Sequence, residues 1–170
     1  LGHEIEVVDV AHTEGVQIGH FDAAVLAASV HLWRHEPEML RFVKQHRLEL
    51  AQIPTAFLSV SMCEAGSESP DTESMRQVRD RLDAYWLMDR FFAATRWHPD
   101  LAEPVAGAIR YTQYSTVVKL VMQQIARSAG GATDTSRDHE FTDWARLDAL
   151  VQRFAKLLEG VPVKKPVAVA

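Results

Sequence analysis

The sequence predicts an α/β protein built as a doubly wound parallel sheet in three layers. Three short apolar runs, at 23–28, 55–60 and 105–109, have the length and continuity of strands that helices cover on both faces. Longer amphipathic segments separate these runs, and their apolar residues recur at helical spacing. Such an alternation is typical of parallel sheets, because each helix returns the chain to the start of the next strand.

The first half of the chain supplies the elements in order. We expect a first strand over Glu4–Val10 and a second over Ala23–Ala28. A helix over Pro37–Glu49 follows, with Pro37 in its first turn, where the missing N–H costs no hydrogen bond. The next strand is Thr55–Val60. The residues of this helix expected to face the core are Met39, Leu40, Phe42, Val43 and Leu50.

The second half continues the alternation. Cys63–Thr72 is rich in Gly, Ser and Glu, and we expect a solvated loop there. A helix over Glu73–Arg96 and a strand over Val105–Ile109 come next, and a last helix is expected from Thr142, as its N-cap, to Leu158. The expected apolar face of the helix at 73–96 comprises Val78, Leu82, Tyr85, Trp86, Met88 and Phe92.

Residues 112–129 form an additional helical segment with two possible roles. Its apolar residues recur at helical spacing, and a core-facing helix is the more frequent structure with this pattern. A surface helix that touches lipid or closes over a lipid-soluble substrate has the same spacing. The pattern alone leaves both interpretations open. The apolar residues concerned are Val117, Leu120, Val121, Met122 and Ile125.

Composition excludes several classes of function. A formal net charge of −5 and a pI near 5.9 argue against nucleic acid as a partner, because phosphate backbones attract proteins with a surplus of Lys and Arg. The single cysteine, Cys63, excludes an internal disulfide and a cysteine-rich metal site, and favours a cytoplasmic protein. We expect one domain over residues 1–160, followed by a disordered tail at 161–170.

The run 130–144 combines small, hydroxylated and acidic residues that do not suit a hydrophobic core. Gly130 and Gly131 allow close backbone approach, and the residues after them offer oxygens that cap turns. From spacing alone, an ordinary αβ connection is the more frequent structure for such a run. The order of residues in this run is more informative about the protein family than its spacing is. Five further segments match one family in the same order: 40–47, 53–61, 93–100, 106–111 and 140–144.

Together with GGATDTSR at 130–137, these segments resemble the flavodoxin-like menaquinone-dependent protoporphyrinogen oxidases. The resemblance implies a flavodoxin-like fold with sheet order 2-1-3-4-5 and FMN as the cofactor. It also implies that a porphyrinogen-like donor reduces the flavin, which then passes electrons to a quinone. In such a sheet the first strand lies inside, so we expect about thirty residues, one βα unit, to be missing ahead of Leu1.

The resemblance implies a cofactor site at the carboxyl ends of the strands, in loops that begin at Ser29, Ser59 and Tyr111. Their mixture of donors and apolar side chains fits a flavin ring, with its apolar faces and polar edge. No side chain is expected to act as a nucleophile or metal ligand. The expected cofactor-binding residues are Ser29, Val30, His31, Leu32, Trp33, Ser59, Val60, Ser61, Met62, Gly107, Tyr111, Thr133, Asp134 and Thr135.

Trp33 departs from the family pattern, because close relatives tend to place Gly at this point. Its ring would either stack on the flavin or fill the space that the flavin needs, and for His31 and Trp33 simple cover of the sheet edge is an equal alternative. His31 and His35 are close enough in sequence for metal ligation, but solvated loop histidines are much commoner.

The family also carries an extra helix at 112–129, which favours a peripheral contact with the inner face of the cell membrane, and homo-oligomers are common enough to expect one. Two alternatives stay open: an electron-transfer flavodoxin or FMN quinone reductase with another donor, and a domain that has lost FMN.

Overall fold

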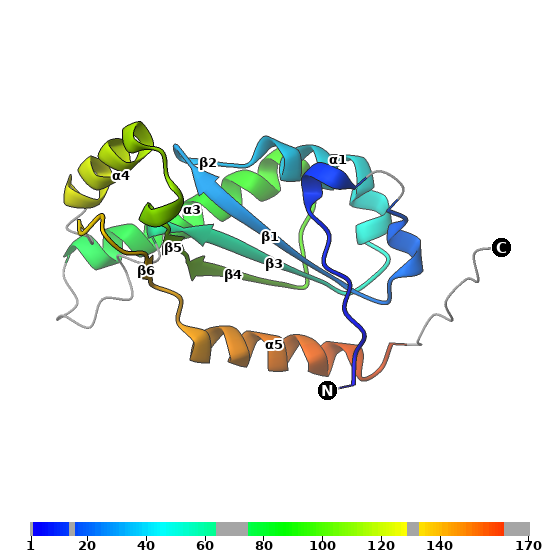
Figure 1. Ribbon diagram of the computed structural model, residues 1–170. Helices are drawn as coiled ribbons and strands as arrows, with labels where there is room; N and C mark the ends of the chain where they lie inside the picture. The colour runs from blue at the N-terminus through cyan, green and yellow to red at the C-terminus, as the bar shows by residue number, and fades with distance from the viewer. Residues whose placement is uncertain (1, 14–15, 64–74, 129–132, 162–170) are drawn as a thin grey trace.

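Three parallel strands form the centre of the molecule in the computed structural model (Figure 1). They are β1 (Ala24–His31), β3 (Thr55–Ser61) and β4 (Leu101–Ala106), with β3 in the middle. A short strand, β2 (Arg34–His35), pairs antiparallel with the end of β1. The structure describes residues 2–13, 16–63, 75–128 and 133–161.

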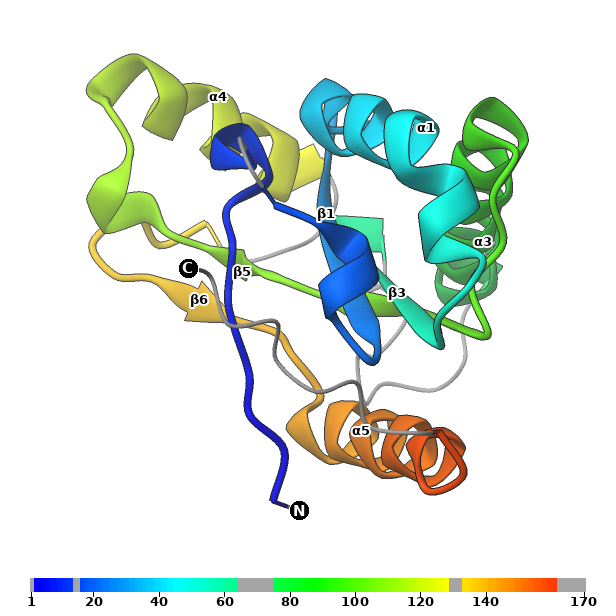
Figure 2. The same cartoon turned by 90° about the vertical axis from the view of Figure 1, so that its right-hand side faces the viewer.

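Helices cover both faces of this sheet, as a three-layer α/β protein requires. Helix α1 (Pro37–Leu50) and helix α3 (Met75–Thr95) lie on one face, and α5 (Trp144–Leu158) lies on the other (Figures 1 and 2). Two short 3-10 helices, η1 (Val10–His12) and η2 (Ile18–His20), pack against α1 before the sheet begins. The predicted doubly wound α/β fold is confirmed.

The main core lies between the sheet and the pair α1 and α3. Aromatic rings dominate its centre: Phe57 of β3 stacks on Phe91 of α3 at 4.5 Å between ring centroids, and Trp97 meets Phe57 edge-on. Burial of such large rings removes much apolar surface from water, which stabilises the fold. The buried members of this core are Ile18, Leu26, Ala28, Met39, Val43, Leu50, Ile53, Phe57, Met88, Phe91, Phe92 and Trp97.

Between β4 and α5 the chain leaves the sheet and returns to it, and we call residues 108–141 the excursion. It contains β5 (Ala108–Ile109), the 3-10 helix η3 (Tyr111–Gln113), α4 (Thr116–Ser128) and β6 (His139–Glu140). Strands β5 and β6 pair antiparallel as a separate two-stranded sheet. Figure 1 shows the excursion at the end of the molecule toward which the arrows of β1, β3 and β4 point.

Two hydrogen bonds close the base of the excursion. The hydroxyl of Thr142 donates to the carbonyl of Ala106 at 2.9 Å, and the N–H of Phe141 donates to the carbonyl of Gly107 at 3.2 Å. The chain therefore enters and leaves the excursion at one place. The excursion also has a small core of its own, formed by Ile109, Tyr111, Tyr114, Met122, Ala126 and Phe141.

The expected first strand, Glu4–Val10, is wrong. Residues 2–9 are exposed throughout, including Ile5 and Val7, and η1 begins at Val10. A strand requires a hydrogen-bonded neighbour, and among the described residues no strand pairs with this segment. Alternating apolar residues alone therefore did not suffice to make a strand here.

The expectation that Ala23–Ala28 is buried on both faces is wrong as well. Leu26 and Ala28 are buried against the helices α1 and α3, whereas Val25, on the opposite face, is 54% exposed and Ala27 is exposed. The reason is the position of α5, which contacts β4 and leaves this part of β1 uncovered by described residues.

Gly107 interrupts the expected strand Val105–Ile109. Strand β4 ends at Ala106, and β5 starts at Ala108 in a different sheet. A Cβ atom at Gly107 would lie 2.8 Å from Cγ1 of Val60, closer than side chains pack. Glycine thus allows the backbone at residue 107 to lie against Val60 of β3, at the point where the chain leaves the main sheet.

Two helix predictions need correction. Helix α5 takes Asp143, not Thr142, as its N-cap: the Asp143 carboxylate accepts from the N–H of Arg146, and the Thr142 hydroxyl serves the base of the excursion instead. The apolar residues of helix α3 extend around more of the helix than the face that contacts the sheet. Only the residues on that face are buried. Met88 and Phe92 are buried as expected, whereas Val78, Leu82, Tyr85 and Trp86 are exposed.

Other expectations fall partly or wholly outside the described ranges. These are most of the loop at 63–72, the first residues of the helix at 73–96, the glycines at 130 and 131, and the tail at 161–170.

Replacing Gly107 by alanine tests the close contact with β3. We expect Gly107→Ala to lower the free energy of unfolding by about 1–3 kcal/mol, because the new Cβ overlaps Val60. Val60→Ala removes the overlapping methyl groups, so the double variant is expected to lose less than the sum of the two single losses. Urea denaturation measures all three, and strict additivity would contradict the contact.

Candidate cofactor site

The carboxyl ends of β1, β3 and β4 meet at one edge of the sheet, where open parallel sheets bind their ligands. The strand register places Ser29 beside Val60 and Ser61 beside Ala106. The predicted starting points of the loops were early, since β1 continues to His31 and β3 to Ser61. The structure therefore brings together the first two of the three predicted segments, with Gly107 next to them.

The segment predicted as a loop from Ser29 to His35 is a β-hairpin. His31 pairs with Arg34, and the two residues between them, Leu32 and Trp33, have φ values of 49° and 64°. Two positive φ angles in a two-residue turn are those of a type I′ turn, which normally contains Asn and Gly. Glycine adopts positive φ freely, so this conformation disfavours the bulky residues Leu32 and Trp33.

The side chains of this turn point outward. Leu32 is 87% exposed and Trp33 is 53% exposed. The ring of Trp33 is therefore not part of the buried core. Its carbonyl accepts a hydrogen bond from Nη1 of Arg90 on α3 at 3.3 Å, and the guanidinium of Arg90 lies 5.3 Å from the ring of Trp86.

His35 of β2 is a buried residue at this edge that the sequence prediction did not include. Its Nε2 lies 2.9 Å from the hydroxyl oxygen of Ser59 on β3, and its ring packs against Phe57 and Phe91. Loss of water around the ring lowers the pKa of His35 to about 4. The imidazole is therefore neutral at ordinary pH. Strand β2 contains only two residues, too few for an alternation of buried and exposed positions to be recognised in the sequence.

At the end of β3 the predicted residues alternate between the two faces. Ser59 and Ser61 are buried on the side of α1 and α3, where Ser59 is engaged by His35. Val60 lies on the other face, against Gly107. Met62 follows at the surface with 37% of its side chain exposed. Backbone and apolar atoms, more than serine hydroxyls, therefore face outward at this end of the strand.

The remaining predicted residues lie in the excursion. Tyr111 is fully buried in its core, against Tyr114 and His139, and burial raises the pKa of its phenol. Asp134 accepts hydrogen bonds from Ser136 and Arg137 and so shapes a local turn.

Hydrogen bonding to Ser136 lowers the pKa of the Asp134 carboxyl. The carbonyl of Thr133 accepts from Gln123 of α4 at 2.9 Å. Thr135, which follows Asp134, is partly buried. These contacts stay within the excursion, and none of the described hydrogen bonds joins Thr133, Asp134 or Thr135 to the strand ends.

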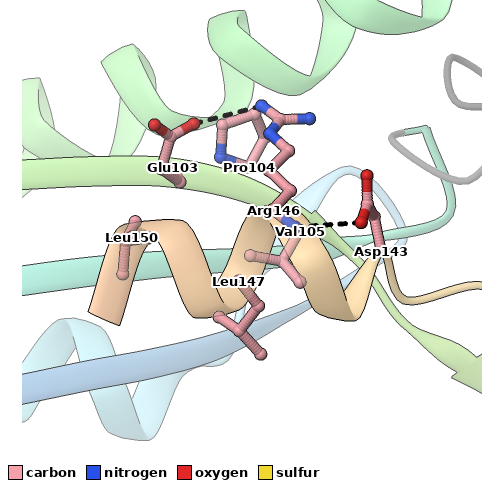
Figure 3. Close-up of a pocket in the computed structure, with 7 residues that line it drawn as sticks. All are labelled: Glu103, Pro104, Val105, Asp143, Arg146, Leu147 and Leu150. Carbon is pink, nitrogen blue, oxygen red and sulfur yellow. Dashed lines mark hydrogen bonds and ion pairs between the residues drawn. The ribbon is translucent and has the colours of Figure 1, made fainter. Parts of the chain in front are cut away.

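A small pocket lies elsewhere, between β4 and the start of α5 (Figure 3). Glu103 on β4 accepts from Arg146 at 3.1 Å and also from Arg153, so one partly buried carboxylate holds two arginines of α5. The apolar part of the lining consists of Pro104, Val105, Leu147 and Leu150. We interpret this pocket as the joint that fastens α5 to the sheet, because its charged groups are already paired.

Metal ligation and membrane spanning are properties that the described parts of the chain can be compared with. Within those ranges, no group of three or more His, Cys, Asp and Glu side chains is placed to hold a metal ion. His31 lies 3.4 Å from Glu36, and His35 is bonded to Ser59. No described helix combines the length and apolar content needed to cross a bilayer.

The low pKa of His35 predicts how stability depends on pH. The native imidazole stays neutral down to about pH 4, whereas the unfolded chain takes up a proton near pH 6.5. Stability contributed by the neutral ring is therefore lost as the pH falls through this window, by at most about 1.4 kcal/mol per pH unit. Urea denaturation at several pH values should show this slope in the wild type and a smaller one in His35→Phe. Equal slopes would contradict the assignment.

Comparison with known proteins agrees with the fold. The family described as flavodoxin domain matches residues 1–136. Protoporphyrinogen IX dehydrogenase [quinone] of Escherichia coli (strain K12) is 28% identical over 164 residues, which cover 96% of this chain and 85% of that protein. The protein with the same name from Leishmania major is 27% identical over 157 residues, covering 92% of this chain and 64% of that protein. The search of solved structures finds no match. The parallel sheet and the family match together show that the chain belongs to the flavodoxin domain family.

Proposed function

We propose that this protein is an FMN-dependent oxidoreductase that transfers electrons from a reduced porphyrinogen-type donor through the flavin to a quinone. The flavodoxin domain and the names of the two relatives support this class of reaction. The observation that carries the proposal is the shared edge at the carboxyl ends of β1, β3 and β4, because ligands of open parallel sheets bind there.

The residues at this edge suit the ring system of a flavin. Leu32, Trp33 and Met62 expose apolar surface that can cover a flat ring. Ser29, Val30 and His31 at the end of β1 offer polar atoms for its edge, and Gly107 lets the chain pass close to Val60. Tyr111, Thr133, Asp134 and Thr135 stay predictions from the resemblance.

Helix α1 does not offer an equivalent place for the phosphate. Helix N-termini bind phosphate through free N–H groups. Helix α1, which starts beside the edge, begins with the carboxylate of Glu36 at its N-cap and with Pro37, which has no N–H. The proposal therefore assigns the flavin ring, and not the phosphate, to the described residues.

The flavin, when bound, supplies the electron chemistry, and the protein supplies position and exclusion of water. His35 is neutral and engaged by Ser59, and burial keeps the phenol of Tyr111 protonated. We infer that the side chains orient the ring and its partners and that no side-chain nucleophile is needed.

Helix α4 supports a quinone as the acceptor. The core-facing interpretation of this helix is wrong for Val117, Leu120 and Val121, which are 71%, 64% and 54% exposed. The helix contains Lys119 and Arg127 and no acidic residue. An exposed apolar helix with cations suits contact with a lipid surface, where quinones dissolve. We propose that α4 makes this peripheral contact.

An electron-transfer flavodoxin or an FMN quinone reductase with another donor is the second candidate. The same strand ends would hold the ring in either protein, and 27–28% identity to the named relatives leaves the donor open. The donor can be identified by single-turnover reduction of the bound flavin with a porphyrinogen and with other reductants. Rapid reduction by another donor, and none by the porphyrinogen, would favour the second candidate.

Flavin binding is the first test of the proposed function. Titration of the full chain with FMN should quench flavin fluorescence with saturable 1:1 binding, because the ring enters the strand edge. Trp33→Ala is expected to weaken binding about tenfold if the ring covers the flavin. Trp144→Ala, which changes another exposed tryptophan at the start of α5, should bind as the wild type does. A protein that takes up no FMN would contradict the proposal.

Vesicle binding tests the proposed role of α4. The double variant Val117→Ser and Leu120→Ser should co-sediment less with vesicles of anionic phospholipid than the wild type, because it loses two exposed apolar side chains. The matched control, Val151→Ser and Leu157→Ser, changes two exposed residues of α5 and should sediment normally. An equal loss in both double variants would show that α4 is not the contact.

A further inference from the structure

The turn at Leu32 and Trp33 has a backbone conformation that its own side chains disfavour. Both residues have positive φ, a conformation in which large side chains crowd the backbone and which Asn and Gly adopt more readily. Such strain persists only where the surrounding structure imposes it, and it is frequent at sites that clamp ligands. The cause of this turn must therefore lie outside its two residues.

The hairpin ladder is too short to impose the turn. Strand β2 contains two residues, and its pairs with β1 are Val30 with His35 and His31 with Arg34. Two-stranded hairpins are marginally stable in water even when they are longer. Contacts with the rest of the protein must hold this one.

His35 makes the buried contact that fastens the hairpin. Its Nε2 bonds the hydroxyl of Ser59 on β3, so it connects β2 to a strand that is not its neighbour. Strand β1 lies between them, and the residue of β1 paired with Ser59 is Ala28, whose small side chain is buried. The rings of Phe57 and Phe91 enclose the imidazole.

A second contact holds the turn from outside. Arg90 donates to the carbonyl of Trp33, and its guanidinium is stacked on Trp86 of the same helix. Because Phe91 is the next residue of α3, this helix touches the hairpin both at its tip and at His35. The strained turn is thus connected to β3 through His35 and to α3 through Arg90.

We propose that His35 is a positioning residue, which through Ser59 holds the strained turn of Leu32 and Trp33 in one conformation at the cofactor edge. The turn is then preformed when the flavin ring arrives, and binding does not have to order it. The part of this inference that concerns flavin rests on the proposed function. The part that concerns the hairpin rests on the contacts of His35 and Arg90 and does not depend on flavin.

Amide hydrogen exchange of the full chain without flavin tests the hairpin. In His35→Phe and in Ser59→Ala, the amides of residues 30–35 should exchange about tenfold faster, as expected for the loss of one buried hydrogen bond, while those of α1 and β3 stay near wild type. Ser59→Ala alters the core least and guards against misfolding of His35→Phe.

The matched control is Thr95→Val, which removes another buried hydroxyl, bonded to the carbonyl of Phe91 in α3, without touching the hairpin. It should leave exchange at 30–35 unchanged. Adding Trp33→Gly to His35→Phe relieves the strain and should slow hairpin exchange again. Unchanged exchange at 30–35 in both His35→Phe and Ser59→Ala, or uniformly faster exchange across the protein, would overturn the proposal.

FMN titration of the same variants tests the link to the cofactor. His35→Phe and Ser59→Ala should raise the Kd for FMN about tenfold, and Thr95→Val should not. Selective hairpin exchange with an unchanged Kd would overturn the link while leaving the proposed function intact. If the wild type binds no FMN, the proposed function fails, and hydrogen exchange still decides whether His35 positions the hairpin.

Discussion

The parallel register of β1, β3 and β4 is the constraint on which the rest of the structure depends. It brings the ends of three strands, distant in sequence, to one edge, and it sets Val60 opposite the point where the chain must turn away at Gly107. The aromatic core between the sheet and α3 keeps this register, because a shift by one residue would expose Phe57 and bury the opposite face. The aromatic core therefore fixes the relative positions of the strand ends at the carboxyl edge of the sheet.

Much of the fold could be predicted because apolar runs and helical spacing report burial directly. The strand at Thr55 and the helix from Pro37 were found within a residue or two. The predictions failed where a neighbour decides the outcome. The segment at Glu4–Val10 has strand-like residues and no described strand beside it, and Val25 is apolar but uncovered, because α5 lies under β4.

The sequence predicted where in the fold the candidate site lies better than it predicted the contacts of the individual residues. Strand ends identify the edge, and hydroxyl and aromatic residues after them identify candidate contacts. Sequence could not show that Ser59 is occupied by His35, since that bond crosses an intervening strand, nor that Leu32 and Trp33 adopt a turn their side chains disfavour. The resemblance grouped Tyr111 with the strand ends, whereas the structure buries it in the excursion.

The closed base of the excursion separates two parts of the protein that can change independently. Because Ala106 and Thr142 are bonded to each other, the path into α5 does not depend on the length of what lies between them. A descendant could therefore lengthen, remodel or lose residues 108–141 and still seat α5 through Glu103. Variation in this region would alter the surface beside the sheet edge and leave the strands of the edge unchanged.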